Sequence, residues 1–451
     1  MKNLDYLKIV IVLLAFSISI TSCNREFPNP NNPSEDDVLT TKDGLYALSI
    51  GMNQYYTTSV LRYIIETPGI TTREFGVTNT FLRPIELARG GNELSGDSYA
   101  TYYPFVGLAR AKGMAESILN SVDNVDLSDE ARASLIAYAS LYKAMTLGHL
   151  ILMYEKAPIH NSIDGEAVYS DRAAVLDECI SLLETGKNEL TTHSVSSDFV
   201  SKVLGSEIDL LASINAFLSR YNLIAGNYAE AISSADAALS STSVFAYDAS
   251  NVNPIWSSTV NTDNLDAQSN FGLIGAYIPE AGDGRVDFYL GADSGNAIAE
   301  TGSQPTSELL GFFATSTSSI PVYLPGEMML IKAEAYARQG TPADLANAVI
   351  QLDLVRTKTD DAFGVNAGLT DWVTSGGDAN SQADILEEIY KNRCIEMFMT
   401  GMRLEDSRRF HPDLLTAPNP PNTTNERNRN FYPYPTVERE NNPNIPDDPA
   451  L

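Results

Sequence analysis

Cys23 is the residue whose surroundings most clearly predict a chemical modification. An apolar run of twelve residues, Ile9 to Ile20, follows two lysines and ends in the tetrapeptide ITSC. The run is too short to cross a bilayer as a helix, but it has the length of a signal-peptide core. This order of an apolar residue, small residues and a cysteine is the pattern of a lipobox. In a lipobox the cysteine thiol is acylated and the chain is cut before the cysteine. We therefore predict a lipoprotein signal peptide over residues 1–22, lipidation of Cys23 and a membrane anchor of several acyl chains.

No pattern of an enzyme active site stands out in the rest of the sequence. The chain has no GxSxG elbow, Walker A loop, dinucleotide fingerprint after a strand, HExxH or CxxC, and its four histidines lack the spacing of metal ligands. Any two of its many carboxylates could be named as a glycosidase pair, but the sequence does not supply their separation. Cys179 and Cys394 are interpreted as small core residues of helices. We therefore predict that the protein is not an enzyme and assign no catalytic residue, cofactor or metal ligand.

The charge of the chain argues against two classes of partner. Acidic side chains number 58 and basic ones 30, which gives a formal net charge of -28. A surface this acidic repels a phosphate backbone and an anionic membrane surface, so we expect no nucleic-acid partner. The simplest interpretation of the charge is that it keeps the protein soluble.

Helical periodicity predicts most of the ordered structure. In SINAFLSRYNLIAGNYAEAISSADAAL, residues 213–239, apolar residues recur at helical spacing on both sides of a Gly226-Asn227 turn, which is typical of a tetratricopeptide-like helical hairpin. Residues 328–357 repeat this pattern, with Gly340 ending one helix and Thr341 capping the next. The predicted fold class is mainly α, a tetratricopeptide-like scaffold of helical hairpins with long irregular loop excursions. Hairpins are predicted over 131–190, 207–240 and 327–357, and further helices over 42–63, 98–121 and 382–400.

Three segments rich in Ser, Thr, Asn, Gly and Asp interrupt the helices, at about 71–97, 241–325 and 365–380. Long irregular segments on a rigid scaffold are the usual place for binding groups. Aromatic side chains occur in them among hydrogen-bonding residues, a combination that suits the apolar face and hydroxyl rim of a sugar ring. For each ring taken singly, packing in the local core is the better explanation, so the hypothesis concerns the group. The candidate ligand-binding residues are Phe75, Arg83, Tyr99, Tyr102, Trp256, Tyr277, Tyr289 and Trp372.

Several stretches of the chain resemble the SusD/RagB family. They include ITSC, ASLIAYASLYKAMTLGHLILMYEKAPI (133–159), LIKAEAYARQG (330–340), ILEEIYKNRCIEMFMTGMRLEDSRRF (385–410) and NFYPYPTVERENNPNIP (430–446). The family pattern Gly-x-Arg-x-x-Asp-x-x-Arg is matched by Gly401, Arg403, Asp406 and Arg409, which we interpret as a structural motif. Met402 and Leu404 depart from the residues common around that arginine. Near the C-terminus the family pattern is matched by Pro433, Pro435, Glu438, Asn442 and Pro443.

The resemblance implies a function that the residues alone do not. Members of this family are surface lipoproteins that bind glycans without catalysis and pass them to a SusC-like TonB-dependent transporter. It implies a SusD-like domain over 38–451, held to the cell outer membrane and facing outward by a tether over 23–37. One alternative is a RagB-like lipoprotein for peptide uptake. A second alternative, from another class, is a surface glycosidase.

Overall fold

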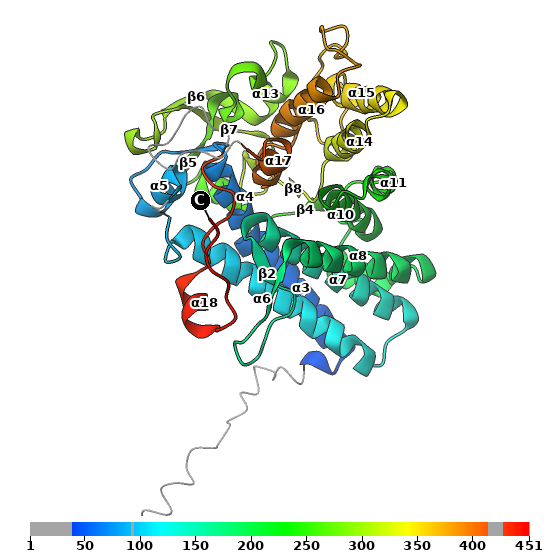
Figure 1. The fold of residues 1–451 in the computed structure, drawn as a ribbon. Helices are drawn as coiled ribbons and strands as arrows, with labels where there is room; N and C mark the ends of the chain where they lie inside the picture. Colours follow the sequence, from blue (N-terminus) through cyan, green and yellow to red (C-terminus); the bar gives the residue numbers. More distant parts are fainter. Residues whose placement is uncertain (1–37, 92–93, 414–426, 451) are drawn as a thin grey trace, which may run out of the picture.

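The computed structural model describes residues 38–91, 94–413 and 427–450. The predicted signal peptide, Cys23 and the tether lie outside the described residues. Helices make up most of the molecule, and a small β-sheet lies at one side of them (Figure 1). The prediction of a mainly α fold is confirmed.

Most helices are long, and the strands are short. The helices are α3 (Lys42–Tyr55), α4 (Leu61–Thr71), α5 (Leu82–Arg89), α6 (Tyr99–Ser121), α7 (Asp129–Met153), α8 (Arg172–Thr192), α9 (Ser197–Phe199), α10 (Leu210–Ala225), α11 (Tyr228–Ala238), α12 (Pro254–Ser258), α13 (Gly284–Tyr289), α14 (Pro325–Gln339), α15 (Pro342–Arg356), α16 (Gln382–Glu396), α17 (Arg403–Phe410) and α18 (Thr436–Asn441). The strands are β1 (Phe75–Val77), β2 (Lys156–Pro158), β3 (Tyr169–Asp171), β4 (Val244–Phe245), β5 (Leu265–Gln268), β6 (Leu290–Asn296), β7 (Pro305–Leu309) and β8 (Ile320–Pro321).

Three helical hairpins, α7/α8, α10/α11 and α14/α15, occupy the three segments predicted for them. Each hairpin packs on the next, since α8 contacts α10 and α11 contacts α14 (Figure 1). This succession is compatible with a tetratricopeptide-like stack. The hairpins turn where the sequence allows it: Gly226 and Gly340 end α10 and α14 in the left-handed conformation, at φ +85° and +75°. The Thr341 hydroxyl caps α15 by accepting the backbone N–H of Asp344.

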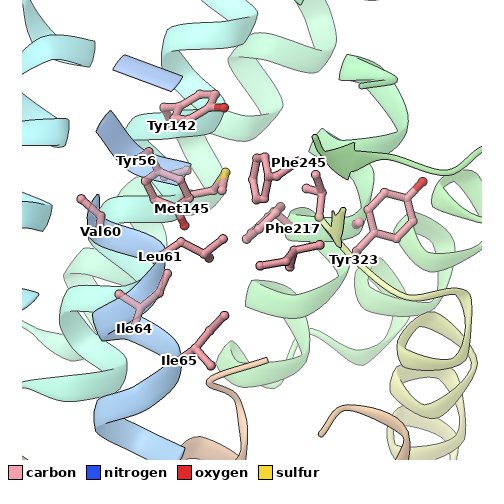
Figure 2. Packing of buried hydrophobic residues seen from close by; sticks show 14 of the residues in the cluster. Tyr56, Val60, Leu61, Ile64, Ile65, Tyr142, Met145, Phe217, Phe245 and Tyr323 are labelled. Atoms are coloured by element: carbon pink, nitrogen blue, oxygen red, sulfur yellow. The ribbon is translucent and has the colours of Figure 1, made fainter. Parts of the chain in front are cut away.

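The first helical segment is longer than predicted. It runs from Lys42 through a π-helical turn at Tyr56–Val60 into α4, which ends at Thr71 and not near Tyr63. Its buried face packs on α7 and α10 in the main core, whose interior is shown in Figure 2. The side chains labelled there are Tyr56, Val60, Leu61, Ile64, Ile65, Tyr142, Met145, Phe217, Phe245 and Tyr323. Helix α4 is therefore fixed against the hairpins by one face.

Helix α7 lies at the centre of this packing. It is long and apolar enough to cross a membrane, yet its most apolar window is entirely buried by the rest of the fold. Its neighbours α6, α8 and α10 cover it, so its composition is that of a core helix. The Arg220 side chain of α10 and Glu327 of α14 form a buried bidentate ion pair at 2.7 and 2.9 Å, which joins two hairpins across the core.

The loop excursions are more regular than predicted. Strand β1, from the first excursion, pairs antiparallel with β5 of the second, with Phe75 opposite Ala267. Strands β7 and β6 continue the sheet in the order β1-β5-β7-β6. The expectation of irregular segments is therefore wrong for these residues, because two excursions far apart in sequence supply each other's hydrogen-bond partners. The sheet brings the loops after β1 and before β5 to the same side of α4.

Candidate ligand-binding site

A pocket of about 430 Å³ opens between α4, α5, the start of α6 and β5. We call it the aromatic pocket. Its lining residues are Arg62, Tyr63, Glu66, Thr67, Ile70, Phe81, Leu82, Arg83, Pro84, Leu87, Ala100, Asn264 and Leu265. Most of the lining residues belong to α4 and α5. Helix α4 packs in the main core, so this wall of the pocket is held in place.

Aromatic rings form one wall of the aromatic pocket and its mouth. Tyr63 stacks on Tyr103 of α6, with ring centroids 5.4 Å apart and planes at 17°. Tyr102 meets Tyr103 edge-on at 5.2 Å. Phe81 stands at the mouth with 61% of its surface exposed, and Tyr103 is 45% exposed. Leu82, next to Phe81, is 59% exposed, and contiguous exposed apolar side chains are a feature of ligand and partner surfaces.

The loop that carries Phe81 is held in place by hydrogen bonds. Asn79 accepts the Phe81 backbone N–H at 2.8 Å, and its side-chain amide donates to Asn264 at 2.6 Å. Thr78 donates to the carbonyl of Asp263 at 2.9 Å. These contacts tie the loop after β1 to the residues before β5. The exposed ring is therefore presented by an ordered support and does not need to be organised by a ligand.

Arg62 and Glu66 form a fixed charged pair on α4. The Arg62 Nε donates to both carboxylate oxygens of Glu66 at 3.0 Å, and its guanidinium lies 5.6 Å from the centre of the Tyr63 ring. Ser258 of α12 also donates to Glu66. Burial raises the pKa of Glu66 above its ordinary value, although Arg62 opposes this effect. The pair orients a guanidinium beside an aromatic ring, an arrangement suited to hydrogen-bonding a polar ligand.

Arg83 lies where the sequence predicted a ligand contact. It lines the aromatic pocket, its side chain is 44% exposed, and its bond to Glu86 is long at 3.4 Å. Tyr102 does not line the pocket; it contacts Tyr103, which stacks on the lining residue Tyr63. Tyr99 is the first residue of α6, next to the lining residue Ala100, and its side chain lies outside the described part of the structure.

Three of the nominated rings are core residues, which corrects the prediction for them. Phe75 is 1% exposed and packs beside Gly69 of α4. Tyr289 is fully buried, and its hydroxyl donates to the Glu396 carbonyl at 3.1 Å. Trp372 is 7% exposed and fills the core between α14, α15 and α16. A buried ring has no free face for a ligand, so these three do not present a binding surface in this structure.

Two further nominated rings lie away from the aromatic pocket. Trp256 is half-buried on α12 and is not among the residues that line it. Tyr277 lies beside α16, where its hydroxyl donates to Glu387 at 2.5 Å. Of the nominated side chains that the structure describes, only Arg83 lines the aromatic pocket.

Sequence reasoning missed Tyr63, Phe81 and the pair Arg62–Glu66. Arg62 and Glu66 are spaced i, i+4, which favours an ion pair on a helix, but the helix was predicted only over 42–63 and Glu66 lies beyond that end. Phe81 and Leu82 are adjacent large apolar residues in a polar segment, but Phe75 of the same segment is buried, so the sequence does not show which ring is exposed.

The predicted structural motif lies inside the fold. Asp406 accepts from Arg393 at 2.9 and 3.0 Å and from Arg409 at 3.0 Å. Arg403 donates to the Phe271 carbonyl. Gly401 has φ +80° and lies against the Ile64 carbonyl of α4. The motif thus packs behind the helix that carries Tyr63.

Among the described residues, no group of three or more His, Cys, Asp or Glu side chains could hold a metal ion. The site that the fold does present is an ordered pocket with stacked tyrosines, an exposed phenylalanine and two arginines. Such a pocket is a candidate ligand-binding site built on a helical scaffold.

Comparisons with known proteins identify the fold. Residues 313–448 match the model of the SusD family. A SusD superfamily protein from Bacteroides thetaiotaomicron has a TM-score of 0.70 and 14% identity, over 91% of this chain and 100% of that one. The Bacteroides fragilis protein NanU has a TM-score of 0.67 and 12% identity, over 94% and 99% of the two chains. A SusD-like carbohydrate-binding protein from Bacteroides vulgatus has a TM-score of 0.63 and 16% identity, over 81% and 83%.

The chain therefore has the SusD fold, and the resemblance to the SusD/RagB family is confirmed. Because these structures share so little sequence with it, they establish the fold and not the ligand. No curated protein matches the sequence.

Proposed function

We propose that the protein is a lipid-anchored SusD-like binding protein of the cell outer membrane. It captures an oligosaccharide in the aromatic pocket and delivers it, chemically unaltered, to a SusC-like TonB-dependent transporter. The observation that carries this proposal is the pocket itself, with stacked and exposed rings beside two arginines on an ordered support. A structural neighbour described as carbohydrate-binding supports the same ligand class.

The aromatic pocket has the chemistry that a sugar requires. The carbon-bound hydrogens of a sugar face pack on an aromatic plane, while its hydroxyls need donors and acceptors at the rim. Burying roughly 100 Å² of apolar surface contributes about 2 kcal/mol per ring. Two or three such contacts suffice for affinities in the millimolar to micromolar range. Tyr63 and Phe81 supply the rings, and Tyr103 supports Tyr63 by stacking on it. Arg62, Arg83 and Asn264 supply the polar groups.

The pocket is poorly suited to glycoside hydrolysis, which supports binding without catalysis. Hydrolysis uses two carboxyl groups on either side of the scissile bond. Glu66 is the one carboxylate among the described residues that line the aromatic pocket, and Arg62 and Ser258 already occupy its oxygens. Release of reducing ends by the purified protein, abolished by Glu66→Gln, would contradict this part of the proposal.

Removing the rings should weaken glycan binding. Glycan and peptide arrays identify the ligand class, and titration calorimetry then compares Tyr63→Ala and Phe81→Ala with the wild type. We expect each variant to bind about thirtyfold more weakly, because one stacking contact of about 2 kcal/mol is lost. The control is Ile350→Ala, which removes an exposed apolar side chain on α15 and should leave affinity unchanged. Binding of peptides and no glycan would support the RagB-like alternative.

Replacing Cys23 with alanine should move the protein from the membrane fraction to the soluble fraction. The acyl chains are attached through that thiol, and each buried methylene contributes about 0.8 kcal/mol to membrane binding. Fractionation and immunoblotting of cells measure the distribution. Cys394→Ala, which alters a buried cysteine in α16, is the control and should stay with the membrane. Membrane retention of Cys23→Ala, or a mature N-terminus without fatty acid, would contradict the proposed anchor.

A further inference from the structure

A second, polar pocket adjoins the aromatic pocket through a shared residue. It has a volume of about 260 Å³ and lies between the π-helical turn before α4, the loop before α12 and α12 itself. We call it the polar pocket. Its lining residues are Thr58, Arg62, Ser250, Asn251, Val252, Pro254 and Ser257. Arg62 lines both pockets, so the two form neighbouring parts of one surface.

The junction between the two pockets is rigid. Glu66 holds Arg62 through two hydrogen bonds at 3.0 Å, and Ser258 of α12 donates to the same carboxylate. Glu66 lines the aromatic pocket, while Ser257, the neighbour of Ser258, lines the polar pocket. One buried contact between α4 and α12 therefore sets the spacing of both pockets.

The chemistry of the polar pocket complements that of the aromatic pocket. Its lining offers three hydroxyl groups, one amide and one guanidinium, with no aromatic ring or carboxylate among its described residues. The hydroxyls of Ser250 and Ser257 make no hydrogen bond to another described residue. Such a lining suits the hydroxyl rim of a sugar unit, because it can donate and accept without requiring an apolar face.

The walls of the polar pocket are preformed. Asp248 accepts the backbone N–H groups of Ser250 and Asn251 at 2.7 and 2.8 Å. The Gln54 amide donates to the Asn251 side chain at 2.6 Å and ties the loop to α3. Asn253 caps α12 and donates to the carbonyls of Phe312 and Ser318. A preformed pocket binds without the entropy cost of ordering a loop.

We propose that the aromatic and polar pockets are two subsites of one extended site for a glycan chain. This inference rests on the proposed function. The aromatic pocket takes the ring face of one part of the chain, the polar pocket hydrogen-bonds the hydroxyls of a neighbouring part, and Arg62 contacts the segment between them. The preferred cargo is then an oligosaccharide long enough to occupy both subsites, and a short fragment reaches only the aromatic one.

The test is the dependence of affinity on chain length. Calorimetry with a series of oligosaccharides of one glycan should show a rise in wild-type affinity once the chain spans both subsites. The double variant Ser250→Ala/Ser257→Ala should bind the long oligosaccharide about tenfold more weakly and the short one as the wild type does. The control Ser201→Ala/Ser240→Ala removes two exposed hydroxyls elsewhere and should change neither affinity.

The outcomes separate this inference from the function on which it rests. If the double variant binds long chains like the wild type while Tyr63→Ala binds them weakly, the polar subsite is refuted and glycan capture stands. Equal wild-type affinity for short and long chains refutes the subsite in the same way. If the wild type binds no oligosaccharide of any length, both the subsite and the proposed function are wrong.

Discussion

Replacing Glu334 with glutamine should lower the free energy of unfolding by about 3–5 kcal/mol at neutral pH. Glu334 lies on α14 with no exposed surface. It accepts from Arg409 at 2.7 and 2.8 Å and from Arg338 at 2.8 Å, and it lies 3.8 Å from Arg393. The neutral amide keeps the size of the side chain but removes the negative charge that balances these buried guanidinium groups. Urea denaturation followed by circular dichroism measures the change.

The effect of Glu334→Gln should depend on pH in a definite direction. Burial by itself would raise the pKa of Glu334, but Arg409 and the neighbouring arginines outweigh it and lower that pKa to about 2. A carboxyl with a depressed pKa stabilises the fold fully above its unfolded pKa of about 4.3, and the contribution is lost as the pH falls toward 2. The stability difference between the wild type and Glu334→Gln should therefore shrink between pH 4.5 and 2.

A matched control separates this buried charge from carboxylates in general. Glu184 of α8 is 44% exposed and lies 3.8 Å from Lys187, so Glu184→Gln should change the free energy of unfolding by less than about 0.5 kcal/mol. Equal effects of the two variants would contradict the structural role of the buried network. The structural motif of Gly401, Arg403, Asp406 and Arg409 would then need another explanation.

The helical hairpins could be predicted because their determinants are local. The apolar spacing around Gly226, and the succession of Gly340, Thr341 and Pro342, act within a few residues, and the structure turns and caps at these residues. The β-sheet could not be predicted in the same way. Its strands are short, and Phe75 is opposite Ala267, so the pairing depends on a contact nearly two hundred residues away.

The candidate site was predicted less well than the fold, for a related reason. Composition located the first excursion correctly, and Arg83 lies in the aromatic pocket. Composition could not distinguish Phe75 from Phe81, although the first is buried and the second exposed. Which ring turns inward is decided by the strand pairing of β1 and by the Asn79 contacts beyond it. The exposure of an aromatic side chain in a loop is thus a tertiary property.

Gly401→Ala should also be strongly destabilising, by about 3 kcal/mol. Gly401 has φ +80°, a conformation that favours glycine, and a Cβ atom there would lie 2.2 Å from the Ile64 carbonyl oxygen. That oxygen belongs to the backbone of α4, which packs in the main core. Neither this helix nor the backbone at Gly401 can therefore move away at low cost. Chemical denaturation measures the loss, and calorimetry should show weaker glycan binding because Tyr63 is the neighbour of Ile64.

Gly226→Ala provides the matched control for Gly401→Ala. Gly226 has a similar φ of +85° in the left-handed conformation, but no atom lies within 4 Å of the position that its Cβ would take. The variant therefore carries the cost of a left-handed backbone alone, about 1 kcal/mol. The difference between the two variants isolates the close approach of Gly401 to α4. If both variants lose the same stability, the glycine is required only for its conformation, and the motif does not position the helix that carries Tyr63.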